Sequence, residues 1–173
     1  MHALHGGRMT DTTHSEATKK MWSMIKGIGS AMMTTEDGGV LRARPMVAAQ
    51  DDFDGNLWFF THASSHKVDE VQGDQRVGVT YADPSKQDYV SLSGQARLVR
   101  DKAAMSAHWQ ESLRTWFPKG IDDPDIALLK VEVTAAEYWD APNSTMLHAY
   151  GYVKAVLTGA PPNPGGNEKL SFT

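Results

Sequence analysis

Short extended runs separated by tight-turn signals are the feature of this 173-residue sequence that most restricts its fold. The clearest example is Glu36-Asp37-Gly38-Gly39, which stands between extended runs at residues 30–35 and 40–50. Asp and Gly at such positions supply the backbone conformations that a tight hairpin turn needs. Further strands are predicted at residues 57–61, 76–81, 89–99 and 126–139. Most of these strands are joined by hairpins, so the sheet should be largely antiparallel.

Six such strands bury their apolar faces most simply by closing into a small barrel with peripheral helices. The predicted class is therefore mainly β (β+α), with helices expected at residues 15–26, 66–72, 101–113 and 144–158. A doubly wound parallel sheet is excluded because the strands do not alternate regularly with helices. We expect one domain over residues 14–159, between a flexible N-terminal lead (1–13) and a disordered, Pro- and Gly-rich tail (160–173).

The composition removes several classes of function. There is no cysteine, which excludes disulfides and thiolate metal sites. The net charge of −4 argues against a dedicated nucleic-acid binder. No apolar run is long enough to span a bilayer and no secretory signal begins the chain, so we expect a cytoplasmic protein without a membrane partner. Glycine-rich nucleotide loops, the hydrolase elbow and the zinc-protease motif are all missing from the sequence.

The segment from Trp58 to Lys67 carries the clearest chemical signal. An aromatic strand ends at Thr61, and Ser65 and Lys67 follow at the start of a predicted helix. Hydroxyl groups, free backbone N–H groups and an ammonium gathered at one point suit a phosphate dianion. The alternative is that Ser65 only caps the helix while Lys67 is a solvated surface residue.

The preceding strand brings a second cation to the same region. Proline removes a ladder donor, so Pro45 should lie on an edge strand, at a bulge or where another group approaches. Its neighbour Arg44 then points to a cationic end of the hairpin. An edge-strand proline beside an outward arginine explains these two residues equally well when they are taken alone.

Together these segments resemble a known family. The order Arg44-Pro45-Met46, Phe60-Thr61, Ser65-x-Lys67, Ser93-Gly94 and Glu137-Tyr138-Trp139 is similar to that of the pyridoxamine-phosphate-oxidase-like split-barrel flavoproteins, and most similar to their general stress protein branch. The resemblance covers residues 15–158. It implies a six-stranded antiparallel split β-barrel with peripheral helices, and a homodimer that binds FMN in clefts between the subunits. A small-molecule redox substrate would act on that FMN.

The resemblance also implies a set of cofactor-binding residues: Arg44, Pro45, Met46, Val47, Phe60, Thr61, Ser65, His66, Lys67, Tyr89, Trp116 and Trp139. In this set Arg44 would contact the phosphate or ribityl chain, and the backbone from Pro45 to Val47 would follow the edge of the isoalloxazine. The hydroxyls and Lys67 would bind the phosphate. His66 stands where the oxidases usually carry a second cation, and Tyr89 would reach the flavin across the dimer.

The departures from the family restrict the reaction. The true oxidases end with an arginine- and histidine-bearing segment that binds pyridoxal phosphate, whereas residues 144–149 here contain no arginine. We therefore do not expect a true pyridoxamine phosphate oxidase. No side chain of the matched set is an evident general acid or base, so the catalytic residues stay unknown. The leading hypothesis is an FMN-dependent oxidoreductase; the alternatives are a non-enzymatic flavin-binding stress protein, or the same fold with deazaflavin or haem.

Two other groups of residues leave alternatives open. Trp109, Trp116 and Phe117 either line the flavin cleft, as in the stress-protein branch, or pack against the barrel. The acidic group Asp122, Asp123 and Asp125 is more typical of a turn and helix start than of a cation site. His62 and His66 stand four residues apart, but the sequence offers no third ligand, so no metal site is predicted.

Overall fold

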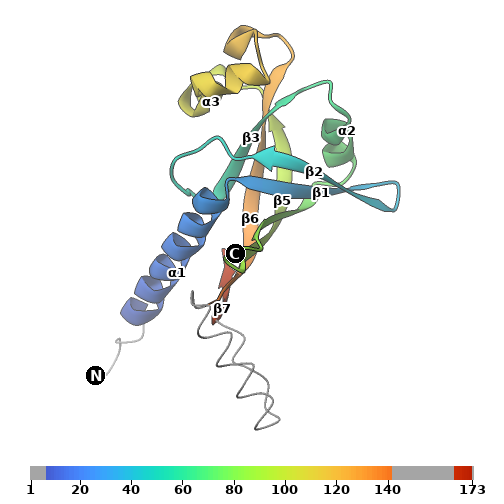
Figure 1. Ribbon diagram of the computed structural model, residues 1–173. Helices are drawn as coiled ribbons and strands as arrows, with labels where there is room; N and C mark the ends of the chain where they lie inside the picture. The colour runs from blue at the N-terminus through green and yellow to red at the C-terminus, as the bar shows by residue number, and fades with distance from the viewer. Residues whose placement is uncertain (1–6, 142–165, 173) are drawn as a thin grey trace, which may run out of the picture.

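Seven strands form one antiparallel sheet in the computed structural model, which describes residues 7–141 and 166–172 (Figure 1). The strand order is β2-β1-β4-β5-β6-β3, and β7 pairs with β6. The strands are β1 (Ser30–Asp37), β2 (Val40–Val47), β3 (Asn56–His62), β4 (Arg76–Asp83), β5 (Asp88–Val99), β6 (Ile126–Asp140) and β7 (Gly166–Ser171). Every pair of neighbours is antiparallel, as the hairpin signals predict.

Three α-helices of the described residues lie around this sheet (Figure 1). They are α1 (Gly7–Ile28), α2 (His66–Gly73) and α3 (Lys102–His108), and two 3-10 helices follow α3: η1 (Glu111–Thr115) and η2 (Gly120–Asp122). The carboxylate of Asp101 accepts hydrogen bonds from the amides of Ala103 and Ala104, which confirms Asp101 as the cap of α3. In the described ranges no helix is long and apolar enough to cross a membrane.

The predicted hairpin turn joins β1 to β2. Gly38 and Gly39 have φ values of 58° and 88°, a backbone conformation that glycine adopts without steric cost. The carboxylate of Glu36 accepts a hydrogen bond from the Gly39 amide and closes the turn. The register that follows pairs Met32 with Pro45, and it leaves β2 as an edge strand, where proline is tolerated.

The sheet remains open between its two edge strands, β2 and β3, as in a split barrel. The segment after β2 approaches β3 closely enough for the Ala49 amide to donate to the Trp58 carbonyl at 2.8 Å. We call the gap between β2 and β3 the seam. The fold class inferred from the sequence, an antiparallel split β-barrel with peripheral helices, is confirmed.

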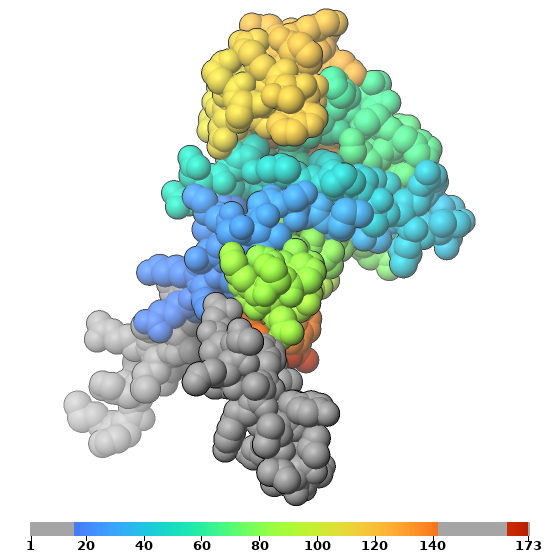
Figure 2. All heavy atoms as spheres, in the orientation of Figure 1, coloured from blue at the N-terminus to red at the C-terminus, as the bar shows by residue number. Residues whose placement is uncertain are grey.

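The core has two parts, one inside the sheet and one at the seam. The first includes the fully buried side chains of Met33, Leu57, Phe59, Val79 and Leu129. The second gathers Ala49, Phe60, Met105, Phe117, Ile126 and Leu128 beneath α3 and η1. We call the segment from α3 to η2 the cap, because it lies directly above the strands of the seam (Figure 2).

At the chain ends the structure differs from the sequence prediction. α1 begins at Gly7, inside the segment expected to be a flexible lead, and β7 lies in the expected disordered tail. The pairing of β6 explains the second difference. β3 covers β6 only as far as Glu132, so residues 135–140 keep a free edge that β7 occupies, with Leu170 buried. A seventh strand therefore joins the expected six.

Two helix predictions also need comment. The helix expected at residues 101–113 is interrupted after His108, and a 3-10 helix at Glu111–Thr115 replaces its second half. The helix expected at residues 144–158 falls outside the described residues.

Candidate functional site

A hollow of about 440 Å³ opens at the seam, between the two edge strands and the cap. β2 contributes Pro45, Met46 and Val47, and β3 contributes Phe60, Thr61 and His62. The remaining lining residues are Ser30, Lys67, Leu113, Trp116 and Phe117. The hollow therefore joins seven of the residues that the sequence predicts for cofactor binding, drawn from β2, β3, the start of α2 and the cap.

The predicted phosphate-binding residues come together at this hollow. Lys67 Nζ donates to Thr61 Oγ1 at 3.1 Å and to Ser65 Oγ at 3.4 Å. The two hydroxyl oxygens are themselves 3.1 Å apart. One ammonium and two hydroxyls thus converge within hydrogen-bond distance of each other, which is the donor set expected around a phosphate oxygen.

Ser65 occupies the N-cap position of α2, but its side chain makes no capping hydrogen bond. Its hydroxyl instead faces Thr61 and Lys67. The alternative in which Ser65 only caps the helix is wrong for this reason.

Lys67 is a cation held in a partly desolvated place. Burial, reinforced by the positive charge of Arg44, lowers the pKa of its ammonium below the usual 10.5. Among the described residues no carboxylate lies within ion-pair distance of Lys67 Nζ. A lysine in this condition favours the approach of an anion, because an anion would restore the electrostatic stabilisation that burial removes.

Asp125 holds the loop between β3 and α2 through hydrogen bonds to Ser64 and Ala63. Its carboxylate accepts the Ser64 amide at 3.0 Å and the Ser64 hydroxyl at 2.6 Å, and its carbonyl accepts the Ala63 amide at 2.6 Å. The Ser64 hydroxyl is the main reason that the pKa of Asp125 is lowered. Asp125 therefore holds the phosphate-binding loop in place, in agreement with the turn role expected for its acidic group.

Arg44 does not line the hollow and is held by a carboxylate that sequence reasoning missed. Its guanidinium donates to Glu70 Oε2 and to Thr35 Oγ1, both at 2.5 Å, while Thr35 also donates to Glu70. Burial raises the pKa of Glu70, but the hydrogen bonds from Thr35 and Arg44 outweigh it, so the pKa lies below its usual value. The sequence marks Glu70 only as a charge on a short helix, with no signal of its burial.

Of the aromatic residues in the cap, Trp109 and Phe117 pack against Phe60, and Phe117 and Trp116 line the hollow. Trp109 meets Phe60 edge to face at 5.5 Å, and Phe117 lies 6.1 Å from the same ring. Trp116 lines the hollow with 64% of its surface exposed. The packing expected of this group holds for Trp109 and Phe117, while the place of Trp116 and Phe117 in a flavin cleft stays a prediction.

Besides Arg44, three predicted site residues lie away from the hollow. His66 faces the β1–β2 turn, where it contacts Asp37 and Glu70. Tyr89 and Trp139 are cross-strand partners, at the start of β5 and the end of β6. Neither residue lines the hollow. The hollow, in turn, includes Ser30, His62 and Leu113, none of which was predicted as a cofactor-binding residue.

Comparison with known proteins matches residues 16–163 to the family described as pyridoxamine 5'-phosphate oxidase like. The chain belongs to this family. The resemblance carried by the five sequence motifs is therefore confirmed, including its general stress protein branch, in which solved relatives are found.

Two solved structures and one further protein illustrate what this chain is similar to. A protein named for general stress protein 26, from Jannaschia sp. CCS1, is 26% identical with a TM-score of 0.72, and the match covers 91% of this chain and 99% of that one. The general stress FMN/FAD binding protein of Xanthomonas citri is 27% identical with a TM-score of 0.67, over 75% of this chain and 92% of that one. Protein bli-3 of Neurospora crassa is 28% identical over 142 residues, or 76% of this chain and 68% of that protein.

Proposed function

We propose that this member of the pyridoxamine 5'-phosphate oxidase like family binds FMN in the seam hollow. The observation that carries the proposal is the convergence of Thr61, Ser65 and Lys67 at a hollow whose remaining lining is mostly apolar and aromatic. A flavin mononucleotide has the matching division, since a phosphate dianion is joined by a polar chain to a flat, largely apolar ring. The name of the Xanthomonas citri relative, a general stress FMN/FAD binding protein, supports the same ligand class.

The residues of the phosphate end suit FMN in charge as well as in position. The Lys67 ammonium has no carboxylate within ion-pair distance in the described part of the chain, so it is free to pair with a phosphate. Thr61 and Ser65 each supply a hydroxyl that can turn its proton toward a phosphate oxygen. The Arg44 guanidinium adds positive potential nearby, although Glu70 holds it.

In this proposal the flavin ring lies against edge strand β2. Edge strands leave half of their N–H and C=O groups without a strand partner, and these groups can bind the polar edge of a flavin. Pro45, Met46 and Val47 line the hollow on this edge, and the exposed ring of Trp116 adds a broad apolar surface to the same hollow. A flavin bound here supplies redox chemistry, which the protein directs by holding and orienting it.

We infer that the complete site needs a second copy of the chain. Large apolar side chains are exposed on β1, β2 and the start of β5: Met32, Val40, Leu41, Val47 and Tyr89. Tyr89 and Trp139 lie away from the hollow of their own chain, as expected if they serve the hollow of the partner. Gel filtration with light scattering should then give twice the chain mass of 19.0 kDa.

The proposed reaction class is oxidoreduction of a small molecule in the cytoplasm. The visible spectrum of the purified protein, followed by release and identification of the bound compound, tests the cofactor. Flavin bands and FMN are expected; a different chromophore, or no uptake of added FMN, would contradict the proposal. Steady-state oxidation of NADH or NADPH with an added acceptor tests the reaction, since a protein that only binds flavin would show stoichiometric cofactor and no turnover.

A further inference from the structure

A second, smaller hollow lies between the β1–β2 turn and α2 and is lined mainly by acid groups. Its volume is about 270 Å³, and its lining residues are Glu36, Asp37, Gly38, His66, Asp69, Glu70, Gly73 and Asp74. Five of these carry carboxylates, whereas three arginines pair with members of the group, namely Arg42 with Asp37, Arg44 with Glu70 and Arg76 with Asp74. The hollow therefore retains an excess of negative charge, which attracts cations.

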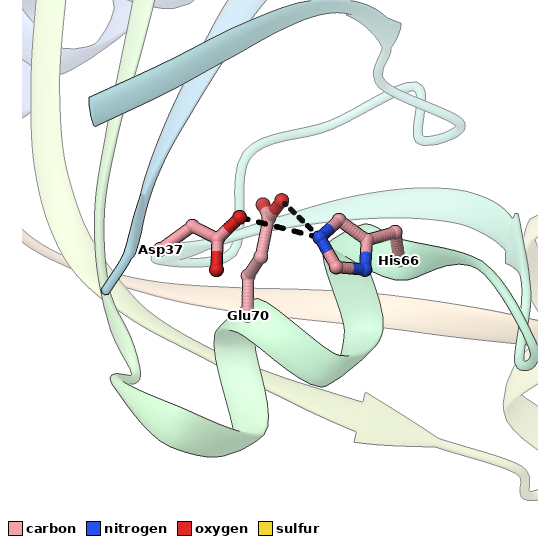
Figure 3. Close-up of side chains that lie close together, drawn as sticks. All are labelled: Asp37, His66 and Glu70. Carbon is pink, nitrogen blue, oxygen red and sulfur yellow. Dashed lines mark hydrogen bonds and ion pairs between the residues drawn. The ribbon is translucent and has the colours of Figure 1, made fainter. Parts of the chain in front are cut away.

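Three potential ligand atoms meet inside it: His66 Nε2, Asp37 Oδ2 and Glu70 Oε1 (Figure 3). The imidazole nitrogen lies 3.2 Å from the Asp37 oxygen and 3.6 Å from the Glu70 oxygen, and all three atoms lie within 4.8 Å of one another. A tetrahedral zinc ion with bonds of about 2.0–2.2 Å places its ligand atoms about 3.3–3.6 Å apart. The two distances to the imidazole fit this geometry.

Glu70 provides a second and independent sign of a bound cation. Its side chain is only 1% exposed, and its Oε1 is a buried oxygen without a hydrogen-bond partner. The other oxygen of the same carboxylate is satisfied by Arg44 and Thr35. A buried carboxylate oxygen left without a donor is costly, and a metal ion is a partner that would satisfy it.

The fold presents these side chains together for a local reason. His66 and Glu70 are four residues apart on α2, so they share one face of the helix. α2 packs against β1, whose last residue is Asp37. Imidazole and carboxylate ligands together suit zinc and other divalent transition-metal ions better than calcium or magnesium, which prefer all-oxygen sites.

We propose that Asp37, His66 and Glu70 bind a divalent transition-metal ion, of which zinc is the representative, with the remaining coordination position open to water. Arg42 approaches both proposed ligand oxygens, at 3.0 Å from Asp37 Oδ2 and 3.8 Å from Glu70 Oε1. Its side chain is 52% exposed and has room to turn away when the ion binds. The ion would fasten the β1–β2 turn to α2, the helix that carries Lys67. The proposal is independent of FMN binding, since no ligand atom belongs to the seam hollow.

The test is a zinc titration of the full chain after treatment with a chelator and dialysis, followed by calorimetry. His2, His5 and His14 are changed to Gln in all samples, so that these imidazoles do not contribute. We expect one zinc ion per chain, and His66→Gln should weaken its binding by at least about tenfold. His62→Gln is the matched control: it removes an imidazole that pairs with Asp125, and zinc binding should not change.

Two further variants keep the result independent of any loss of folding. Asp37→Asn alters a partly exposed ligand and should weaken zinc binding as His66→Gln does, whereas Asp69→Asn alters an acid group of the same hollow outside the ligand set and should not. Zinc should also raise the melting temperature of the chain that still carries His66, and should leave the melting temperature of His66→Gln unchanged. Absence of zinc binding, or equal binding by His66→Gln and by the chain that still carries His66, would overturn the proposal and leave the His66 ring only hydrogen-bonded to Asp37.

Discussion

The guanidinium of Arg44 donates to the buried carboxylate of Glu70 at 2.5 Å, which joins edge strand β2 to helix α2. The same two elements both line the seam hollow, through Pro45, Met46 and Val47 on β2 and Lys67 on α2. This pair therefore fixes the distance between the proposed ring and phosphate ends of the site.

Replacing Arg44 tests this connection. Arg44→Met should destabilise the protein by about 3 kcal/mol, because it removes the nearer of the two guanidinium groups that pair with the buried Glu70 carboxylate and leaves only Arg42, at 3.8 Å. Arg44→Met combined with Glu70→Leu should recover much of the loss, since no buried charge then remains unpaired. Urea unfolding of the single and double variants measures both values. A single variant as stable as the wild type would show that the pair contributes nothing.

Lys67→Ala should weaken FMN binding far more than riboflavin binding. Only FMN carries the phosphate, and a charge-assisted hydrogen bond contributes about 1.5–3 kcal/mol, or roughly 10- to 150-fold in affinity. Fluorescence quenching of each flavin on titration with protein gives the two dissociation constants. Lys86→Ala, which removes an exposed lysine paired with Asp83, is the control and should affect neither. Equal losses for both flavins would place the phosphate elsewhere.

Without flavin, Lys67 should make the stability of the protein depend on pH in the alkaline range. Because its pKa in the folded state lies below the usual 10.5, the unfolded chain binds the proton more tightly. The free energy of unfolding contributed by this residue therefore rises between its folded-state pKa and about 10.5. Lys67→Met should remove that rise and be at least as stable at pH 7. The difference between the two unfolding curves, measured from pH 7 to 10.5, isolates the effect.

Gly94 should not tolerate a side chain. It lies at the β-bulge between β5 and β6, where an added Cβ would come within 2.4 Å of the Glu132 carbonyl oxygen and 2.9 Å of Val131 Cγ1. Because the first contact is backbone, relief requires the two strands to separate. Gly94→Ala should therefore cost about 1–3 kcal/mol. Gly27→Ala is the control, since nothing lies within 4 Å of its added Cβ. Thermal unfolding compares the two, and similar melting temperatures would contradict the close approach.

Much of the fold could be predicted because its signals are local. Glu36 to Gly39 specify a tight turn by their own backbone preferences, and Pro45 allows β2 to be only an edge strand or an irregular one. β7 could not be predicted in the same way. It forms because β3 ends its pairing early along β6 and leaves a free edge, a consequence of register that residues 166–171 do not encode by themselves.

The sequence alone determined the antiparallel split barrel, the family and the types of residue at the phosphate end, because turn chemistry, strand alternation and motif order are carried by neighbouring residues. Only the tertiary structure decided how those residues act. It turned the Ser65 hydroxyl from the helix end toward Lys67, separated buried Phe117 from exposed Trp116, and placed Glu70 between Arg44 and His66. Each of these outcomes depends on contacts between segments distant in the chain, where packing and desolvation, rather than local preference, set the energy.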